Sequence, residues 1–223
     1  KTIRVPQPVL LGVVNNDAFI VLEHLFLSSS SSQSDDQLGT QLAALHKIKR
    51  AYFGWHQNNT IGSTKQINTP SDNWVSFWQQ HRLGFQLSLA ATNSYSNKLI
   101  DSGYKLCDCL AHFFSDYQPI PSLLHGDLWG GNVSAANQNQ PIIYDPACYY
   151  GDRETDIAMT ELFGGFSANF YATYNESFPL DCGYKVRKNL YNLYHILNHL
   201  NLFGNSYQQQ AQHLTDSLLA EIN

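Results

Sequence analysis

The sequence predicts an α+β fold in which helices predominate and the strands are few and short. Three observations support this prediction. Residues 9–14 and 18–25 are apolar stretches joined by Asn15-Asn16-Asp17, a turn sequence typical of a β-hairpin. Apolar residues recur with helical spacing through most of the second half of the chain. Between these regions, two short apolar runs each lead directly into a polar cluster.

The composition argues against several classes of protein. With 223 residues, 43% of them hydrophobic and 14% charged, the chain suits one large globular domain or two small ones. Its net charge of −5 lacks the basic excess of a nucleic-acid-binding protein. There is no signal-peptide pattern and no apolar run of about 20 residues, the length of a membrane span. The four cysteines contain no Cys-x-x-Cys pair, which argues against a zinc site. Disulfides of a secreted protein are the alternative, and we favour free buried thiols in a cytoplasmic protein. We expect no nucleic-acid or membrane partner.

Helices are predicted from the spacing of apolar residues and from capping signals. A helix over 35–49 follows the capping pair Ser34 and Gln37, and further helices cover 72–82 and 96–115. The aromatic residues of 72–82 are assigned to the core. Residues 51–72 are irregular, and so long a loop inside a compact domain is often functional, here as part of a substrate pocket. The C-terminal third is predicted to form four helices, over 155–162, 168–177, 183–203 and 207–221.

The two polar clusters follow two predicted strands, 122–124 and 141–144, with an Asn/Gln-rich run turning the chain between the strands. Asp127 and Asn132 follow the first strand and Asp145 follows the second, so we expect the three side chains to lie close together. Carboxylate and carboxamide oxygens suit Mg²⁺, which takes one or two carboxylates beside substrate phosphates. The remaining group can accept a proton from an attacking hydroxyl.

His125-Gly126-Asp127, with Asn132 five residues after the aspartate, resembles the catalytic loop of small-molecule kinases with the protein-kinase-like fold. Protein kinases carry Asp-Phe-Gly where this chain has Asp145-Pro146-Ala147. The flanking sequence is more specific and resembles the fructosamine kinase (ketosamine-3-kinase) family over nearly the whole chain. The motifs that carry this resemblance are Phe53-Gly54-Trp55-His56, Asn59-Thr60-Ile61-Gly62-Ser63-Thr64, Trp129-Gly130-Gly131-Asn132, Asp145-Pro146-Ala147-Cys148-Tyr149-Tyr150-Gly151, Arg153-Glu154-Thr155-Asp156-Ile157-Ala158-Met159, Leu162-Phe163-Gly164-Gly165-Phe166 and Tyr194-His195-Ile196-Leu197-Asn198-His199-Leu200-Asn201.

The resemblance implies roles for the clustered residues. Asp127 would orient the acceptor hydroxyl and accept its proton, while Asn132 and Asp145 would bind Mg²⁺ beside ATP. The acceptor would be the 3-hydroxyl of a ketosamine, either a small molecule or a sugar on a protein lysine, and the reaction would serve deglycation repair. An aminoglycoside kinase or a choline kinase is the alternative within enzymes. A catalytically silent kinase-like binding module is the alternative of another class.

The resemblance also implies how the chain is divided. Residues 28–223 would form a mostly helical C-terminal catalytic lobe, and residues 1–27 would be the end of an N-terminal lobe with the hinge. The main chain of Glu23, His24 and Leu25 would then face the adenine ring, and an ordinary hairpin is the alternative. The sequence before Asp127 contains neither a glycine-rich loop that would bind phosphates nor the strand lysine that accompanies such a loop. The chain begins at Lys1. We therefore expect a fragment that is inactive without its N-terminal lobe.

Other polar and aromatic residues have two interpretations each. Trp129 either contacts the sugar or holds the loop as a core residue. Glu154, or Asp152 beside it, either faces a cationic amine of the substrate or belongs to a solvated acidic helix start. Asp156 either caps the helix that follows or bonds to the backbone of the catalytic loop. His125 is expected to be structural and to brace its loop by hydrogen bonding. His195, Asn198 and His199 are expected to belong to the core.

Overall fold

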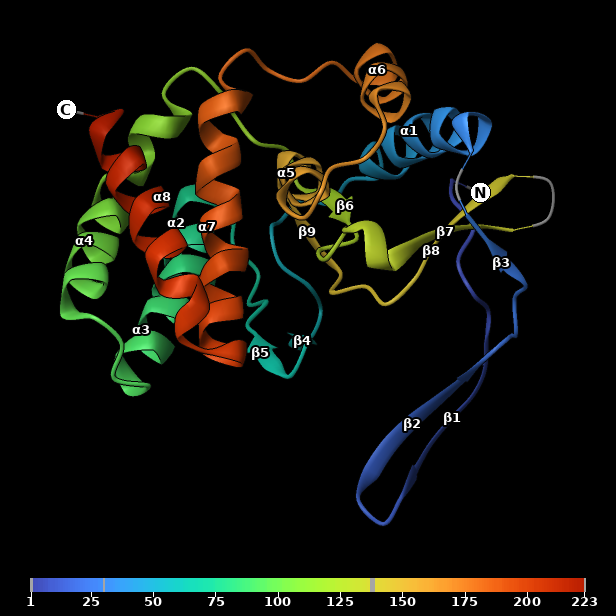
Figure 1. Cartoon of the computed structure of the whole chain (residues 1–223), viewed down its shortest axis with the longest axis horizontal. Helices are drawn as coiled ribbons and strands as arrows, with labels where there is room; N and C mark the ends of the chain where they lie inside the picture. The colour runs from blue at the N-terminus through green and yellow to red at the C-terminus, as the bar shows by residue number, and fades with distance from the viewer. Residues whose placement is uncertain (1, 30, 137–138, 223) are drawn as a thin grey trace.

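The computed structural model describes residues 2–29, 31–136 and 139–222. A helical body, a central group of short strands and a projecting N-terminal hairpin follow one another across the molecule (Figure 1). The two ends of the chain lie on opposite sides. No described helix is long and apolar enough to span a membrane. The predicted α+β class, with helices predominating, is confirmed.

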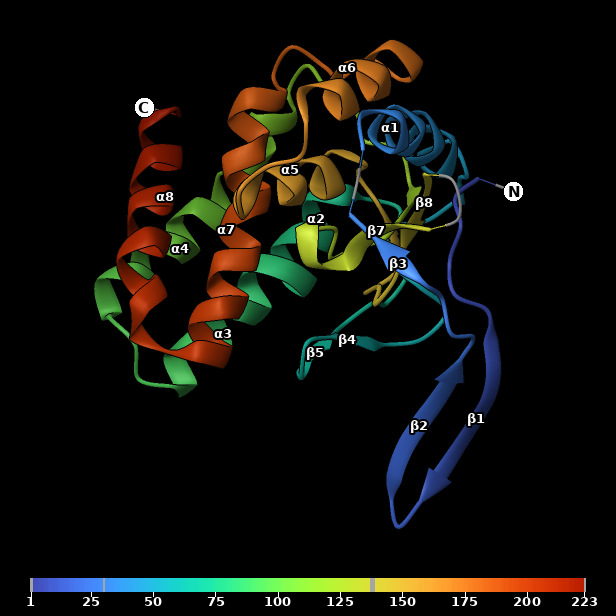
Figure 2. The same ribbon diagram turned by 45° about the vertical axis from the view of Figure 1, so that its right-hand side comes forward.

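The N-terminal hairpin consists of β1 (Pro8–Val14) and β2 (Asp17–Leu22), paired antiparallel from Pro8 opposite Leu22 to Val14 opposite Asp17. Asn15 and Asn16 form the turn with φ of 50° and 71°, a conformation that asparagine tolerates better than most residues. The predicted hairpin is confirmed, although its second strand ends at Leu22 and not at residue 25. Both faces of this two-stranded sheet are exposed, apolar side chains included, and it extends away from the body (Figure 2).

The strands at the centre pair differently from the prediction. β6 (Ser122–Leu124) and β8 (Gln140–Ile143) both form, but they are not partners. β8 pairs with β7 (Val133–Ala136), which pairs in turn with β3 (Leu27–Ser28), whereas β6 pairs with β9 (Tyr149–Gly151). The sequence analysis missed β7, whose Val-Ser-Ala-Ala sequence carries little strand signal. Of the predicted turn over 137–140, residues 137 and 138 lie outside the described residues.

The helices form two groups around the strands. α7 (Tyr184–Phe203) lies at the centre of one group, against α3 (Gly84–Thr92), α5 (Glu154–Leu162) and α8 (Gln208–Ala220). α4 (Asn97–Asp108) covers α3 and α8 from outside. The second group is the pair of α1 (Ser32–His46) with α6 (Ala168–Ser177), and α1 also packs against β6 and β8. The four predicted C-terminal helices are confirmed to within one residue at each end.

The earlier helices depart from the prediction at their ends. The capping box of α1 joins Ser31 to Ser34, not Ser34 to Gln37, so the helix begins at Ser32 and ends at His46. The helix predicted over 72–82 is α2 (Trp74–Trp78), which continues through a π-helical turn (Gln79–Leu83) into α3. The helix predicted over 96–115 ends at Asp108, and a 3₁₀ turn follows over Leu110–Phe114.

Aromatic side chains fill the centre of the core. Trp74, Phe77 and Trp78 of α2 are buried, as predicted, and the Trp78 ring lies 5.0 Å from that of Tyr191 on α7 between centroids. All four cysteines are free thiols, with Cys107 buried and Cys182 exposed. The segment over 51–72 contains a small hairpin, β4 (Asn59–Ile61) with β5 (Thr64–Gln66).

Candidate active site

The loop after β6 and the loop after β8 approach each other at Gly126. Its φ is +84°, and a Cβ atom on it would lie 2.1 Å from the carbonyl oxygen of Ala147. The N–H of Ala147 donates to the carbonyl of His125 at 2.9 Å, which fixes this close approach. Only glycine fits such a position without strain, because it alone combines a left-handed backbone with no side chain. The glycine between the histidine and the aspartate therefore joins the two loops.

The structure brings Asp127, Asn132 and Asp145 together, as the sequence predicted. The amide nitrogen of Asn132 donates to the main-chain oxygen of Asp127 at 2.8 Å and to its carboxylate at 3.3 Å. The same nitrogen lies 3.4 Å from the main-chain oxygen of Asp145. Asp145 has φ of 55°, a strained conformation for a residue other than glycine, and such strain is found preferentially at functional sites.

The charges of this cluster favour a cation. Burial, followed by the charge of Asp145, raises the pKa of Asp127 to about 6. Among the described residues that line the surrounding pocket there is no lysine or arginine to balance the two carboxylates. The amide nitrogen of Asn132 is the donor in its three bonds, which leaves the amide oxygen to bind a metal. This oxygen-donor set fits Mg²⁺, which prefers hard ligands.

Asp156 holds the backbone of the catalytic loop, one of its two predicted roles. Its two carboxylate oxygens accept the N–H groups of His125 at 2.7 Å and of Gly126 at 2.8 Å. His46 of α1 bonds the same carboxylate through Nε2 at 3.1 Å. Burial alone would raise the pKa of Asp156, but the hydrogen bond and charge of His46, together with the loop N–H groups, lower it. Asp156 therefore fixes the two residues that precede Asp127.

His125 braces the loop, as expected. Its Nε2 lies 3.0 Å from the carbonyl oxygen of Tyr144, and its Nδ1 accepts the N–H of Asp127 at 3.3 Å. Burial lowers the pKa of His125, which favours the neutral ring that this arrangement requires. His125 thus links the ends of β6 and β8.

The clustered residues open into a pocket of about 580 Å³, a size typical of small-molecule sites. Trp129 lines it and is 40% exposed, which rules out the interpretation of Trp129 as a buried core residue. Ile61 and Gly62 also line it, so the long segment over 51–72 does help to form the pocket, as predicted. The remaining wall is largely aromatic and aliphatic, and it consists of Met159, Phe163, Asn198, His199, Leu202, Phe203 and Tyr207.

Two predicted assignments need correction. Glu154 does not line this pocket: its carboxylate is fully buried and is bound by Arg187 at 2.8 and 3.0 Å. Asp152 is also buried, where it accepts the hydroxyls of Tyr117 and Tyr191. Neither carboxylate is available to a substrate amine. His199 was assigned to the core, but it lines the pocket.

The predicted hinge residues lie at the base of the N-terminal hairpin, away from the pocket lining. Glu23 pairs with Arg4 at 2.6 Å and exchanges hydrogen bonds with the main chain of Gln7. The His24 ring stands edge-on to Phe26, with centroids 4.9 Å apart. Among the described residues, no group bonds the main-chain oxygen of Glu23 or the N–H of Leu25.

Sequence reasoning missed two groups of functional candidates. His199 and Phe203 lie four residues apart at the end of α7, a spacing that could have indicated a shared surface of that helix, and Tyr207 follows in the 3₁₀ turn over Asn205–Tyr207. The second group is the pair of His46 and Tyr174, which supports Asp156. The Tyr174 hydroxyl lies 2.7 Å from Nδ1 of His46, and no spacing in the sequence indicated this contact. They lie 128 residues apart and meet only through the packing of α1 on α6.

The proteins with sequences similar to this chain carry kinase names. The model of the fructosamine kinase family matches residues 1–221. A Synechocystis protein named "Probable ketoamine kinase" is 46% identical over 98% of this chain and 74% of its own length. The chloroplastic "Protein-ribulosamine 3-kinase" of Arabidopsis thaliana is 41% identical over 98% of this chain and 68% of its own. The crystal structure of a "Putative fructosamine-3-kinase" from Haemophilus somnus superposes with a TM-score of 0.88 at 33% identity, covering 98% of this chain and 74% of that one.

Proposed function

This chain belongs to the fructosamine kinase family, and we propose that it carries the acceptor site and catalytic base of an enzyme that phosphorylates the 3-hydroxyl of ketosamines with ATP. The names of its relatives, ketoamine kinase and protein-ribulosamine 3-kinase, support this reaction. A ketosamine is a sugar condensed onto an amine, which can be a lysine of a glycated protein. The observation that carries the proposal is the position of Asp127 beside Asn132 and Asp145 in one pocket.

Asp127 is the proposed base. Its carboxylate orients the 3-hydroxyl and takes the hydroxyl proton while the oxygen bonds to the γ-phosphorus of ATP and the bond to the departing ADP oxygen breaks. Phosphoryl transfer depends mostly on positioning and charge neutralisation, so a strong base is not needed. Because burial raises the pKa of Asp127 to about 6, the carboxylate is a better proton acceptor than an ordinary aspartate and is still ionised at neutral pH.

Asn132 and Asp145 are the proposed Mg²⁺ ligands. When bound, Mg²⁺ supplies positive charge that neutralises the phosphate oxygens of ATP. The protein holds the amide oxygen of Asn132 in place through the bonds that its nitrogen donates to Asp127. It holds Asp145 through the left-handed backbone at that residue and through Gly126, which allows the two loops to approach.

The division of the chain into lobes is also proposed. Residues 28–223 would be the C-terminal catalytic lobe, and residues 1–27 the end of the N-terminal lobe and the hinge, where Glu23, His24 and Leu25 contact adenine. No group in the described part of the chain bonds the main-chain oxygen of Glu23 or the N–H of Leu25, and this supports the hinge assignment. Apolar residues exposed on both faces of the β1–β2 hairpin support its membership of a larger sheet, because two strands alone are marginally stable.

Trp129 is proposed to lie against the sugar and its amine. An indole offers an apolar face to sugar C–H groups and attracts a cationic amine. Trp129→Ala should therefore raise KM for a ketosamine while ATP affinity and Tm stay nearly unchanged, because the side chain is 40% exposed. Steady-state kinetics and thermal unfolding would measure both. A loss of about 3–5 kcal/mol of stability, as for a buried aromatic residue, with unaltered KM would contradict this role.

A substrate panel on the full-length protein tests the proposed function. ATP turnover would be measured with ketosamines, aminoglycosides and choline at matched concentrations, with Asp127→Asn as the inactive control. We expect turnover with ketosamines alone. Preferential turnover of an aminoglycoside or choline would favour the other kinase class, and binding without any turnover would favour a silent binding module.

The proposed cellular role is deglycation repair in the cytoplasm, in which the phosphorylated ketosamine separates from the amine. Two measurements test it: localisation of the tagged full-length protein, and release of free amine from a glycated peptide after phosphorylation. Retention of the sugar on the peptide after phosphorylation would contradict the repair role.

A further inference from the structure

Two side-chain amides of the β4–β5 hairpin bind the main chain that follows Asp145. Asn59 of β4 donates from Nδ2 to the carbonyl oxygen of Cys148 at 2.8 Å. Gln66 of β5 donates from Nε2 to the carbonyl oxygen of Ala147 at 3.0 Å. One hairpin therefore holds two consecutive carbonyl groups in the loop that carries Asp145.

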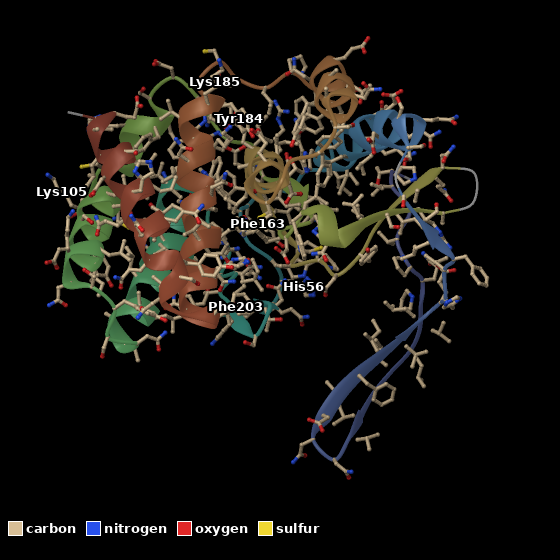
Figure 3. All side chains as sticks on the ribbon, in the orientation of Figure 1. His56, Lys105, Phe163, Tyr184, Lys185 and Phe203 are labelled. Atoms are coloured by element: carbon tan, nitrogen blue, oxygen red, sulfur yellow. The ribbon has the colours of Figure 1, made fainter. Side chains whose placement is uncertain are left out.

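The same hairpin forms part of the pocket wall. Ile61 and Gly62, where β4 ends and the chain turns, line the pocket that contains Asp127. A Cβ atom on Gly62 would lie 3.2 Å from the side chain of Leu202 near the end of α7. Figure 3 shows the hairpin beside this end of α7, with His56 labelled in the segment that leads into β4. The hairpin thus connects the wall of the pocket with the loop after β8.

The direction of these amides is set by Arg82, which is fully buried in the π-helical turn between α2 and α3. A guanidinium can only donate, so its bond of 2.9 Å to Asn68 fixes the amide oxygen of Asn68 toward it. The amide nitrogen of Asn68 then donates to Oδ1 of Asn59 at 2.7 Å, which leaves Nδ2 of Asn59 to donate to the loop. Single π-helical turns are frequently found at functional sites, and this one holds the cation that orients the hairpin amides.

Gln66 is buried with its amide fully bonded. Besides the bond to Ala147, its Nε2 donates to Oδ1 of Asn59 at 2.9 Å, and its Oε1 accepts the hydroxyl of Tyr194 on α7 at 3.0 Å. A shift of the hairpin relative to the loop would leave buried polar groups without partners, which is costly. The hairpin, α7 and the loop are therefore held in one arrangement.

The conformation of Asp145 needs such support. Its φ is 55°, whereas a residue before proline, here Pro146, favours an extended conformation with negative φ. The N–H of Ala147 donates to the carbonyl of His125 at 2.9 Å, and the carbonyl of Ala147 accepts from Gln66. The main chain two residues after Asp145 is thus fixed by the catalytic loop on one side and by the hairpin on the other.

We propose that Asn59 and Gln66 are positioning residues for metal binding, because they hold the loop after β8 in the conformation that presents the carboxylate of Asp145 to Mg²⁺. The inference rests on the proposed function, since it takes Asp145 to be a Mg²⁺ ligand. Neither amide is among the described residues that line the pocket, so both act through the loop and not on the acceptor. Their removal should weaken metal binding even where the fold is intact.

Binding of Mn²⁺ to the full-length protein tests this inference without turnover. Mn²⁺ takes the same oxygen ligands as Mg²⁺, and water-proton relaxation reports the Mn²⁺ held on the protein beside a saturating, non-hydrolysable ATP analogue. Gln66→Met and Asn59→Leu keep the approximate size of each side chain and remove its amide. We expect each variant to raise Kd for Mn²⁺ by about 10–100-fold, the usual effect of removing a group that supports a metal ligand.

Two control variants separate positioning from loss of stability. Lys65→Met changes the exposed residue next to Gln66 on β5 and should leave Kd for Mn²⁺ and Tm unchanged. Leu218→Ala opens a cavity in the core at α8, outside the pocket lining, and should lower Tm without changing Kd for Mn²⁺. A rise in Kd that also appeared in Leu218→Ala would show that the effect is one of stability and would overturn the inference.

The remaining outcomes separate this inference from the proposed function. Asn59 is only half-buried, so Asn59→Leu decides the result even where Gln66→Met does not fold. A Kd for Mn²⁺ equal to that of the wild type in Asn59→Leu would overturn the inference, while a weaker Asp145→Ala would leave the proposed function intact. Equal Kd values for the wild type and Asp145→Ala would instead overturn the metal assignment of the proposed function.

Discussion

At the scale of single residues, the site depends most on Asp127. Asp127→Asn preserves the shape of the side chain and still allows a hydrogen bond with Asn132, but it removes the carboxylate that we propose as the proton acceptor. In the full-length protein we expect kcat to fall by about 10²–10⁴-fold, the usual contribution of a positioned base. ATP affinity should change little. Turnover close to that of the wild type would exclude Asp127 as the base.

Asp145 and Asn132 should differ in their response to Mg²⁺. Asp145→Ala removes the charged one of the two proposed ligands and should abolish Mg²⁺-dependent turnover, whereas Asn132→Ala removes the neutral one and should weaken it. The measurement is a titration of activity against Mg²⁺ at saturating ATP. Superimposable Mg²⁺ curves for the wild type and Asp145→Ala would show that the metal assignment is wrong. Circular dichroism of both variants would control for misfolding.

The site residues that could be predicted from the sequence were those that lie in a recognisable local motif. Asp127, Asn132 and Asp145 follow strands at fixed spacing, so their proximity could be predicted and the structure confirms it. Glu154 could not be distinguished from a solvated acidic residue, because its partner Arg187 lies 33 positions away. His199 was missed for a related reason. Helical periodicity identifies a buried face but does not show where that face opens into a pocket.

At the scale of elements, the meeting of two loops depends on Gly126. Gly126→Ala would place a methyl group 2.1 Å from the Ala147 carbonyl oxygen in a left-handed conformation. We expect loss of activity and lower stability, with the conformation alone costing about 1–2 kcal/mol. Gly130→Ala in the same loop is the matched control, since a Cβ there meets no atom within 4 Å. Chemical denaturation and activity assays of both variants provide the measurement, and equal effects would contradict this explanation.

Elements with strong local signals were predicted well, and those set by tertiary contacts were not. The C-terminal helices carry long apolar periodicity, and their ends were predicted to within one residue. β7 has small residues and exists because β3 and β8 lie on either side of it. The π-helical turn over Gln79–Leu83 joins α2 to α3, and nothing in its local sequence distinguishes it from an ordinary helix end. The pairing of β6 with β9 likewise could not be predicted, because it depends on tertiary contacts and not on the local sequence.

At the scale of the whole molecule, distant segments converge to hold the catalytic loop. Arg153 donates to the hydroxyl of Tyr174 at 3.0 Å, and that hydroxyl lies 2.7 Å from Nδ1 of His46. His46 Nε2 then bonds Asp156, which accepts two N–H groups of the loop. Every donor has an acceptor when the hydroxyl of Tyr174 donates to Nδ1 of His46 and Nε2 donates to Asp156. The packing of α1 and α6 is thereby coupled to the position of Asp127, which the sequence alone could not reveal.

The stability of the whole molecule should depend on pH through His195. This side chain is buried on α7, and among the described residues none bonds its Nδ1. Burial, followed by the charge of His199, lowers the pKa of His195 to about 3. Between pH 6.5 and 3, the unfolded chain therefore binds a proton that the folded protein does not. Stability rises with pH in this window and is lost as pH falls, by about 2 kcal/mol between pH 7 and pH 5.

Urea denaturation from pH 5 to pH 8 would test this dependence by comparing the wild type with His195→Gln and His195→Leu. Glu154 contributes with the opposite sign, because burial raises its pKa to about 7 and the folded state then binds the extra proton. Its contribution is common to all three proteins and cancels in the difference. We expect the variants to lose less stability than the wild type as pH falls below 6.5, whatever their stability at pH 8. Parallel curves over the whole range would show that His195 titrates alike in the folded and unfolded states. The total stability of a domain is about 5–15 kcal/mol, so 2 kcal/mol is a measurable share of it.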